Sequence, residues 1–360
     1  MMKTLDTAGD LSGKHVLLRA DFDVPIADGA IAEDFRILRQ QRQIRELLDA
    51  GARVVVIAHI SAVESFSPLQ ERIEEILGVK FAFLNSPEHL AEFWESNEPL
   101  ALLENLRTWP GEEAGDEAFA QSLARGADMF VNNAFAVCHR PHASVVGIAR
   151  ILPAYAGELV VAEVQQLGNV ISAPAEGKYI FIGGAKGATK TPVIRNLIGN
   201  AEGIAVGGVV ANDILKERGV DIDASQSDAN AHELLAGVDV NDPRLLVPED
   251  NVNDSGRIVD IGPKTAQRFA DVARSAKLAV WNGPMGKFED ERFLGGTRTL
   301  AEGFAASTGF TVIGGGDTIA AVAACGIGFE KFGFVSTGGG AMLAFLAGSA
   351  MPGLQLLGYT

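Results

Sequence analysis

The chain has 360 residues, a formal net charge of −16 and two cysteines. Its length suits two domains better than one hydrophobic core, and its negative charge argues against nucleic acid and anionic membranes as partners. The two cysteines give neither a disulfide framework nor a zinc pattern. No apolar run reaches 18 residues, and the N-terminal stretch lacks the apolar core of a signal peptide, so we expect a cytoplasmic protein without a membrane span.

In the first half, short apolar strands alternate with helices. Asp34–Ala50 carries apolar residues near helical spacing, and Gly51 follows it as a typical helix end. The expected strands of this half are His15–Ala20, Arg53–His59, Leu100–Leu103 and Met129–Val131. Strands that alternate with helices indicate βαβ units and a parallel sheet.

The second half repeats this plan. Its expected strands are Tyr179–Ile182, Ile204–Val206, Leu245–Val247, Leu278–Val280, Phe310–Ile313 and Phe332–Val335, and its expected helices include Lys264–Ala276 and Thr297–Ala306. Between the halves, Glu158–Ser172 has an apolar stripe and stops before Ala173-Pro174, which predicts a joining helix and a candidate hinge. The predicted fold is α/β, with two doubly wound parallel-sheet (Rossmann-like) domains joined by this helix.

Three glycine-rich turns follow strands in the last third: WNGPMGKFE at 281–289, GGGDT at 314–318 and STGGGA at 336–341. Glycine lets backbone N–H groups approach a ligand, and a helix N-terminus favours an anion. Three such turns from neighbouring strand ends predict a phosphate-lined site. Asp317 is placed to hold a metal on those phosphates, and Glu289 to bind a ribose hydroxyl, which indicates the nucleotide half of a kinase.

A lysine pair follows the first strand of the second half, in GGAKGATKTPVI at 183–194. Lys186 and Lys190 are four apart, so they share one side if the turn enters a helix, and two ammonium groups would neutralise a transferring phosphoryl group. A P-loop is an alternative, but Thr189 stands where that motif requires glycine. A solvated helix start is a second alternative.

Charged residues also cluster after the strands of the first half, where open parallel sheets bind ligands. The cationic side chains and histidines are Arg19, Arg36, His59, Arg107, His139, Arg140 and His142. Arginine presents a planar fork to carboxylate and phosphate groups, so these side chains would bind a small polyanion if they converge. The alternative is that they are merely solvated.

These stretches resemble phosphoglycerate kinase over nearly the whole chain and in the same order. The matching segments are LLRADFDVP (17–25), DFRI (34–37), VVVIAH (54–59), LLENLRTWPGEE (102–113), VNNAFAVCHRPHAS (131–144), GGAK (183–186), DIGPKT (260–265), WNGPMGKFE (281–289), IGGGDT (313–318) and STGGGA (336–341). The resemblance implies a two-domain, hinge-bending, monomeric kinase that transfers a phosphoryl group between ATP or ADP and 3-phosphoglycerate, with Mg²⁺. It implies an N-terminal acid-binding domain (1–157), an interdomain helix (158–173), a nucleotide-binding domain (174–347) and a final segment (348–360) that packs back on the first domain.

The resemblance also assigns site residues by position. The substrate-binding residues are Asp21, Asp23, Arg36, His59, Arg107 and Arg140. The nucleotide-binding residues are Gly184, Lys190, Gly207, Asn282, Gly283, Pro284, Glu289, Gly315, Gly316, Asp317, Thr318 and Gly338. The catalytic residues are Arg36, Lys186, Lys190, Gly339 and Gly340. The metal-associated residue is Asp317.

The chain departs from the family pattern mainly on the acid-binding side. Asp23 stands where the family has asparagine, and Ala62 stands where it has an arginine of the substrate patch. Smaller departures are Thr189 before the second lysine and Val209 at a third glycine. Two explanations follow: a working kinase, for 3-phosphoglycerate or a related acid, or a nucleotide-binding protein with a regulatory role.

Overall fold

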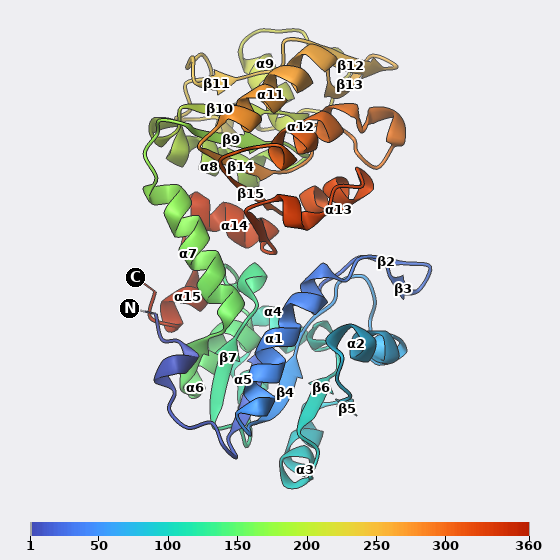
Figure 1. The fold of residues 1–360 in the computed structure, drawn as a ribbon, viewed down its shortest axis with the longest axis vertical. Coiled ribbons are helices and arrows are strands. Elements are labelled where there is room, and N and C mark those ends of the chain that lie inside the picture. Colours follow the sequence, from blue (N-terminus) through green and yellow to red (C-terminus); the bar gives the residue numbers. More distant parts are fainter. Residues whose placement is uncertain (1, 360) are drawn as a thin grey trace. The chain divides into compact units, whose positions relative to one another are not determined.

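Two six-stranded parallel sheets, each flanked by helices, organise the protein (Figure 1). The computed structural model describes residues 2–359. The chain divides into two units by its internal contacts: the first runs to Gln165 and resumes at Ala350, and the second is Gln166–Ser349. The predicted α/β class with two doubly wound parallel sheets is confirmed.

The first sheet is wound outward from a central strand. Its order is β5 (Ala82–Leu84), β6 (Leu100–Leu103), β4 (Arg53–Ile57), β1 (His15–Arg19), β7 (Met129–Asn132) and β8 (Ala154–Ala156). Because the chain builds first on one side of β1 and then on the other, β1 and β7 flank a switch point, where ligands bind in open parallel sheets.

The helices of the first unit follow the predicted alternation. They are α1 (Phe35–Asp49), α2 (Gln70–Leu77), α3 (Leu90–Glu95), α4 (Pro110–Ala114), α5 (Glu117–Ala124), α6 (Ile148–Ile151), the first part of α7 (Glu158–Ser172) and α15 (Pro352–Leu356), and a small hairpin joins β2 (Ile26–Ala27) to β3 (Ala30–Ile31). The boundary between the two units falls within α7, at Gln165.

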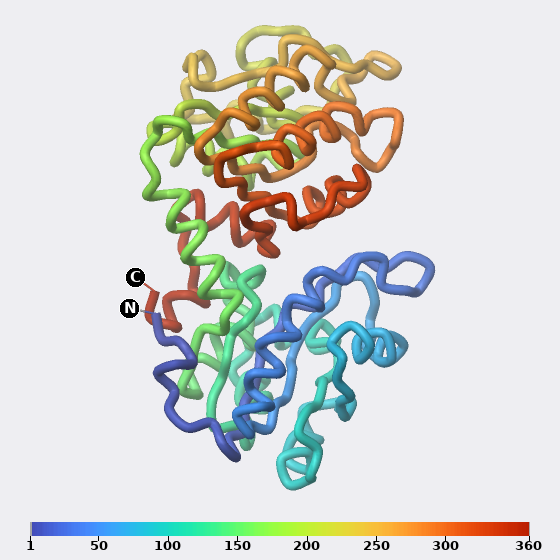
Figure 2. The backbone as a smooth tube through the Cα atoms, viewed as in Figure 1, coloured from blue at the N-terminus to red at the C-terminus, as the bar shows by residue number. Residues whose placement is uncertain are grey.

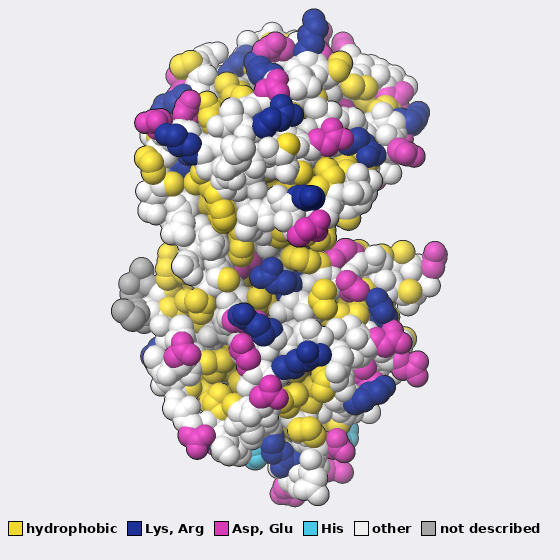
Figure 3. All heavy atoms as spheres, viewed as in Figure 1, with side chains coloured by type: hydrophobic (Ala, Val, Ile, Leu, Met, Phe, Trp, Pro, Cys, Tyr) yellow, Lys and Arg dark blue, Asp and Glu magenta, His cyan; other side chains and the backbone are white. Residues whose placement is uncertain are grey.

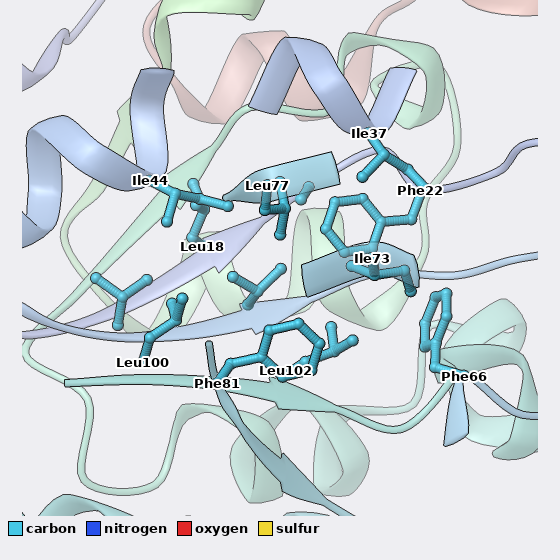
Figure 4. Packing of buried hydrophobic residues seen from close by; sticks show 14 of the residues in the cluster. Leu18, Phe22, Ile37, Ile44, Phe66, Ile73, Leu77, Phe81, Leu100 and Leu102 are labelled. Carbon is cyan, nitrogen blue, oxygen red and sulfur yellow. The ribbon is translucent and has the colours of Figure 1, made fainter. Parts of the chain in front are cut away.

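An apolar core fixes α1 and α2 against the first sheet (Figure 4). Ile44 of α1 lies beside Leu18 of β1, and Ile37 of α1 lies beside Phe22, with Ile73 of α2 close by; all five side chains are fully buried. Burial of such side chains contributes about 1.5–3 kcal/mol each. This packing holds the start of α1, and with it Arg36, at the carboxyl end of β1.

The second sheet has the order β11 (Leu245–Leu246), β10 (Gly203–Val206), β9 (Lys178–Ile182), β14 (Leu278–Asn282), β15 (Phe310–Gly314) and β16 (Phe334–Ser336). Here the chain changes sides between β9 and β14. The helices of this unit are α8 (Gly187–Leu197), α9 (Gly208–Glu217), α10 (Ala231–Leu234), α11 (Pro263–Ser275), α12 (Gly295–Ala305), α13 (Gly316–Ala324) and α14 (Gly339–Leu346), and a hairpin pairs β12 (Asn251–Asp254) with β13 (Arg257–Ile261).

The predicted elements are present, with ends that shift by one or two residues. The predicted helix Glu158–Ser172 has the bounds of α7, whereas β16 starts two residues later than expected and β11 is one residue shorter. The short strands β5 and β8 and both hairpins were not predicted. At most two residues of each strand are buried, so they lack the continuous buried run of strands such as β6 and β7.

Residues from both ends of the sequence meet in the first unit (Figure 2). Lys3 N–H donates to the Leu357 carbonyl (2.7 Å), and Gly353 N–H donates to the Cys138 carbonyl (2.9 Å). On the face drawn in Figure 3, acidic and basic side chains are interspersed. No helix within residues 2–359 is long and apolar enough to cross a membrane.

Candidate functional site

The glycine-rich turns of the second unit form one hydrogen-bonded group at the carboxyl edge of its sheet. Gly184 N–H donates to the Pro284 carbonyl (2.7 Å), Gly208 N–H to the Met285 carbonyl (2.9 Å) and Val209 N–H to the Gly184 carbonyl (3.1 Å). The turns after β9, β10 and β14 are therefore held together at the point where the chain changes sides.

Lys190 lies buried within this group. Its Nζ donates to Asn282 Oδ1 (3.1 Å), and Asn282 Nδ2 donates to the Gly314 carbonyl (2.8 Å). Burial lowers the pKa of Lys190 to about 8; Asp317 opposes this shift and Lys186 reinforces it. The group therefore contains a desolvated ammonium that gains from a nearby anion.

Lys186 and Lys190 do not share a helix face. The helix α8 begins at Gly187, so Lys186 occupies the N-cap position with a non-helical backbone and an exposed side chain. Lys190 lies inside the helix and is buried. The four-residue spacing rule requires both residues to be helical, so its condition is not met here, although Lys186 is close enough for its charge to act on Lys190.

Thr318 ties two of the turns together. Its Oγ accepts the Gly283 N–H (2.7 Å) and donates to the Gly314 carbonyl (2.8 Å). Gly283 (φ +91°) and Gly315 (φ +102°) have backbone angles that favour glycine, and a Cβ at Gly283 would lie 2.2 Å from the Gly183 carbonyl oxygen. Only glycine fits these turns, so the backbone can come close to a ligand.

Four helices that follow strands at this edge begin with glycine. Their first residues are Gly187 (α8), Gly208 (α9), Gly316 (α13) and Gly339 (α14). The starts of α13 and α14 are adjacent, since a Cβ on Gly339 would lie 3.2 Å from the Gly315 Cα. Helix N-termini present unpaired N–H groups and partial positive charge, so this edge is suited to a phosphate chain.

Asp317 is the acidic residue in the first turn of α13, and its side chain is exposed. Within the described residues, no three His, Cys, Asp or Glu side chains group together as a metal site. Mg²⁺ is held by one or two carboxylates together with substrate phosphates rather than by an all-protein cage. A single carboxylate beside a phosphate-type edge therefore fits a metal that arrives with a nucleotide.

The first unit gathers charged side chains after β1. Arg36 Nη1 donates to the Asp23 carbonyl (2.7 Å) and lies 3.8 Å from Asp21 Oδ1. Asp21 Oδ2 and Arg107 Nε are buried and have no hydrogen-bond partner among the described residues. Buried polar atoms without partners are rare, so these two atoms mark a place where a polar ligand is expected.

Arg107 and Arg140 are each partly engaged. Arg107 Nη1 lies 2.6 Å from Glu113 Oε1, and Arg140 Nε donates to His139 Nε2 (3.4 Å). Both arginines are half-buried. Burial, followed by the charge of Arg140, lowers the pKa of His139 to about 4, so His139 is neutral at pH 7 and leaves the positive charge to Arg140.

Asp23 is already bound within the protein. Its Oδ1 accepts the Ser61 N–H (2.8 Å), and its Oδ2 lies 3.5 Å from His59 Nε2. Burial alone would raise the pKa of Asp23, but the contacts with His59 and Ser61 outweigh it and hold that pKa well below its ordinary value. Ala62 is exposed in the loop after His59, and no cation stands in residues 60–66.

Two of the expected cationic side chains serve an internal network instead. Arg19 Nε donates to Ser144 Oγ (2.9 Å), and Ser144 donates through N–H (2.9 Å) and Oγ–H (2.5 Å) to the Glu112 carboxylate. His142 Nδ1 lies 3.6 Å from Glu112 Oε1. Arg19 and Glu112 are fully buried, so the expectation that Arg19 and His142 join a ligand patch is wrong.

Sequence reasoning missed Glu112 and Ser144 as members of this network. Burial would raise the pKa of Glu112, but hydrogen bonds from His142 and Ser144 and the charge of Arg19 lower it below its ordinary value. Both residues lie inside the quoted segments LLENLRTWPGEE and VNNAFAVCHRPHAS. Their position in those segments was the only indication of a role, and the neighbouring residues in sequence do not indicate that Glu112 and Ser144 contact each other.

Most of the predicted nucleotide residues lie in the group described above. These are Gly184, Lys190, Gly207, Asn282, Gly283, Pro284, Gly315, Gly316, Asp317 and Thr318. Gly338 is buried at the N-cap of α14, ahead of Gly339 and the exposed Gly340. Glu289 is exposed farther along the loop after β14. The predicted acid-side residues Asp21, Asp23, Arg36 and His59 lie together, and Arg107 and Arg140 extend from loops of the same unit.

Two doubly wound sheets, with glycine-started helices at a switch point, define a class of α/β proteins that bind ligands at the carboxyl edges of their strands. Comparison with known proteins narrows this class. The sequence model of one family, Phosphoglycerate kinase, matches residues 5–349. The chain therefore belongs to the phosphoglycerate kinase family, and the predicted resemblance is confirmed.

Individual relatives and solved structures agree with this assignment. The chain is 37% identical over 398 residues to phosphoglycerate kinase of Sphingopyxis alaskensis, covering 99% of this chain and 98% of that protein. It is 38% identical over 383 residues to that of Moorella thermoacetica, covering 97% of each. Among solved structures, phosphoglycerate kinase from Pyrococcus horikoshii OT3 has a TM-score of 0.88 at 29% identity, covering 99% of this chain and 98% of that one. The enzyme from Coxiella burnetii has a TM-score of 0.81 at 30% identity, covering 99% of both chains.

Proposed function

We propose that this chain transfers a phosphoryl group between ATP or ADP and the carboxylate of 3-phosphoglycerate, as the glycolytic phosphotransferase of its family. The observation that carries the proposal is the buried Lys190, bound to Asn282 at an edge where four helices begin with glycine. A desolvated cation and a row of backbone N–H groups are what a phosphoryl group in transfer requires.

The first unit would bind the acid. Arg36, Arg107 and Arg140 supply fixed positive charge, and the unpartnered Asp21 Oδ2 and Arg107 Nε are available to a polar ligand. Arginine forks pair well with both carboxylate and phosphate groups. The interdomain helix 158–173 would then join this acid-binding domain (1–157) to the nucleotide-binding domain (174–347), with the segment 348–360 completing the first.

The second unit would bind the nucleotide. The glycine turns and the N-termini of α13 and α14 would hold the phosphates, Glu289 would take the ribose, and Asp317 would hold Mg²⁺, which supplies charge neutralisation on the phosphates. The acid's carboxylate oxygen would attack the γ-phosphorus in line while the bond from that phosphorus to the β-phosphate oxygen breaks and ADP leaves, and the reverse transfer makes ATP. Lys190, Lys186, Arg36 and the N–H groups of Gly339 and Gly340 would neutralise the charge that develops, so catalysis rests on positioning and electrostatics.

Transfer requires that an acid held by one unit meets a nucleotide held by the other, so we propose hinge bending during turnover. Small-angle scattering at saturation with both ligands is expected to give a smaller radius of gyration than without ligands, and an unchanged profile would contradict this. We also propose a cytoplasmic location, supported by two cysteines, Cys138 and Cys325, that remain free, and a monomeric state, as the family resemblance implies.

A coupled ATPase assay tests the reaction. MgATP is supplied with 3-phosphoglycerate or with small carboxylic acids such as glycerate and acetate, and turnover is expected to be fastest with 3-phosphoglycerate. Faster turnover with another acid would support the kinase activity but contradict 3-phosphoglycerate as its substrate.

A second candidate is a nucleotide-binding regulator without turnover. The observation in its favour is the departure at the acid side, where Asp23 adds a carboxylate and Ala62 supplies no cation. Binding of MgADP without turnover on any acid would support this candidate and contradict the kinase.

A further inference from the structure

His59 lies between a guanidinium and a carboxylate. Its Nδ1 is 3.0 Å from Arg19 Nη2, and its Nε2 is 3.5 Å from Asp23 Oδ2. A guanidinium donates hydrogen bonds and never accepts them, so Nδ1 must be the acceptor and the ring proton must reside on Nε2. The neutral imidazole therefore directs its single N–H toward the Asp23 carboxylate.

Arg19 is held in place from the interior. Its Nε donates to Ser144, its Nη1 donates to the Ala20 carbonyl, and Ser144 is bound in turn by the Glu112 carboxylate. Arg19, Ser144 and Glu112 are fully buried. A satisfied buried network resists rearrangement because each broken contact leaves a polar group without water. The tautomer of His59 is thus fixed by groups that a ligand does not reach.

Asp23 is held from the opposite side. The Ser61 N–H binds its Oδ1 at 2.8 Å, and Asn105 holds the following loop by donating to the carbonyls of Ile60, Val63 and Glu64. The Asp23 side chain is 30% exposed, whereas that of His59 is 5% exposed. The face that meets solvent is therefore the carboxylate rather than the imidazole.

The charged groups around the pair come from several elements. Arg19 and Asp21 lie on and after β1, Arg36 on α1 and Glu112 on α4. Burial lowers the pKa of His59, the contact with Asp23 opposes this, and Arg19 reinforces it, so that the pKa stays below its ordinary value.

We propose that Asp23 is a specificity-determining residue of the acid site, because its carboxylate takes the only N–H of a His59 ring whose other nitrogen is occupied by Arg19. Recognition of the acid then falls to Arg36, Arg107 and Arg140. Asp23 also places a fixed negative charge beside the incoming acid, so it weakens the binding of an anionic acid relative to a neutral side chain at this position. The identity of the acid rests on the proposed function, whereas the state of His59 does not.

Imidazole NMR of the full chain in the absence of ligands tests the first part. The His59 signal is identified by its loss in His59→Gln. The expected result is a neutral ring at pH 7 with the proton on Nε2, which stays neutral at pH values where an exposed histidine becomes charged. A proton on Nδ1, or a charged ring at pH 7, would overturn the proposal.

Calorimetric titration of 3-phosphoglycerate tests the second part, as a double-mutant cycle on Asp23 and His59. Asp23→Asn removes the fixed charge and frees the His59 N–H, so the Kd is expected to fall about tenfold, the size of one charge-assisted contact. His59→Gln alone is expected to change the Kd less than about threefold, but to cancel much of the gain in the Asp23→Asn background. A loss of tenfold or more from His59→Gln alone would show that His59 binds the acid directly, and would overturn the proposal.

Glu64→Gln is the matched control. Glu64 is exposed in the loop after His59, so this change removes the same unit of charge without touching the imidazole. An exposed charge is screened, so the Kd is expected to shift less than twofold at physiological salt. If Glu64→Gln and Asp23→Asn change the Kd equally, Asp23 acts only through the net charge of the protein, and its specific role is overturned.

The two tests separate this inference from the proposed function. If wild type and Asp23→Asn both bind MgADP but neither binds 3-phosphoglycerate, the proposed acid is wrong and the claim about its recognition is overturned with it. The imidazole spectrum still decides, on its own, whether Arg19 and Asp23 hold His59.

Discussion

The two candidate ligand regions consist of different chemical groups: mainly backbone in the second unit and charged side chains in the first. In the second unit, glycine turns and helix starts present the backbone, and one buried lysine, Lys190, stands among them. In the first unit, charged side chains pair with each other before any ligand is present, as Asp23 does with His59 and Arg107 with Glu113. The glycines that shape each turn of the second unit are encoded locally, whereas the pairing of Asp23 with His59 depends on a partner far away in the sequence.

Breaking the internal network of the first unit is expected to have the largest effect. Glu112→Gln removes the buried carboxylate that is linked to Arg19 through Ser144 and gives the guanidinium its largest favourable charge interaction. Loss of one partner of a buried charged pair costs about 3–5 kcal/mol. Urea unfolding followed by the fluorescence of Trp94 and Trp109, both in the first unit, would measure this loss. Glu113→Gln, which removes an exposed carboxylate from its pair with the half-buried Arg107, is expected to cost less than about 1 kcal/mol.

The effect of Glu112→Gln should also depend on pH. The folded pKa of Glu112 lies below its ordinary value, so its contribution is complete at neutral pH and is lost as pH falls through the folded pKa. The difference between wild type and variant is therefore expected to shrink in acid. A constant difference down to pH 3 would contradict the charged pairing of Glu112.

Removal of the buried lysine of the second unit comes next. Lys190→Ala is expected to lower kcat about 10²- to 10³-fold, as loss of one preorganised electrostatic contact does, with a much smaller change in nucleotide Kd. Lys216→Ala, at an exposed position on α9, is the control and should leave both values unchanged. Equal losses of kcat and nucleotide affinity would refute a role for Lys190 in the transition state.

The third prediction concerns the charged side chains of the acid-binding region in the first unit. Asp23→Asn with Ala62→Arg removes an anion and adds a cation, so 3-phosphoglycerate is expected to bind roughly ten- to a hundredfold more tightly, since a charge-assisted hydrogen bond contributes about 1.5–3 kcal/mol. The gain should shrink as salt rises, and nucleotide affinity should hardly change, because both positions lie in the first unit. If wild type already binds the acid as tightly as the variant, other residues supply these contacts.

The smallest expected effect is the uptake of a fraction of a proton when nucleotide binds. Lys190 has a pKa of about 8, so it is mostly charged below that pH and mostly neutral above it. A bound phosphate raises this pKa, so nucleotide binding near pH 8.5 is expected to take up a fraction of a proton, and binding at pH 6.5 to take up almost none. Calorimetry in buffers of different ionisation enthalpy measures the uptake, and Lys190→Ala should abolish it at pH 8.5.

The same contrast explains what the sequence alone could predict. Strand, glycine and helix start are neighbours in sequence, so the turns at Gly283, Gly315 and Gly339 were predicted correctly. The different environments of Lys186 and Lys190 were not, because they depend on where α8 begins.

The first unit was harder to predict because its charges act in pairs. Arg19, His59, Glu112 and Ser144 come from four distant segments, and only the folded sheet brings them together. An arginine at a strand end has the same local sequence whether it meets a ligand or a buried glutamate. The short hairpin strands β12 and β13 lacked a clear pattern for a related reason, since few of their side chains are buried.

The chain path of the first unit has a consequence for biosynthesis. Because that unit includes residues before Gln165 and residues after Ala350, the ribosome must make the whole second unit before the first has all its parts. At ordinary rates of synthesis this is a delay of roughly ten seconds or more. During that time the surface around Cys138 that α15 later covers stays without its partner, while the second unit, which is continuous in sequence, can fold as soon as it emerges.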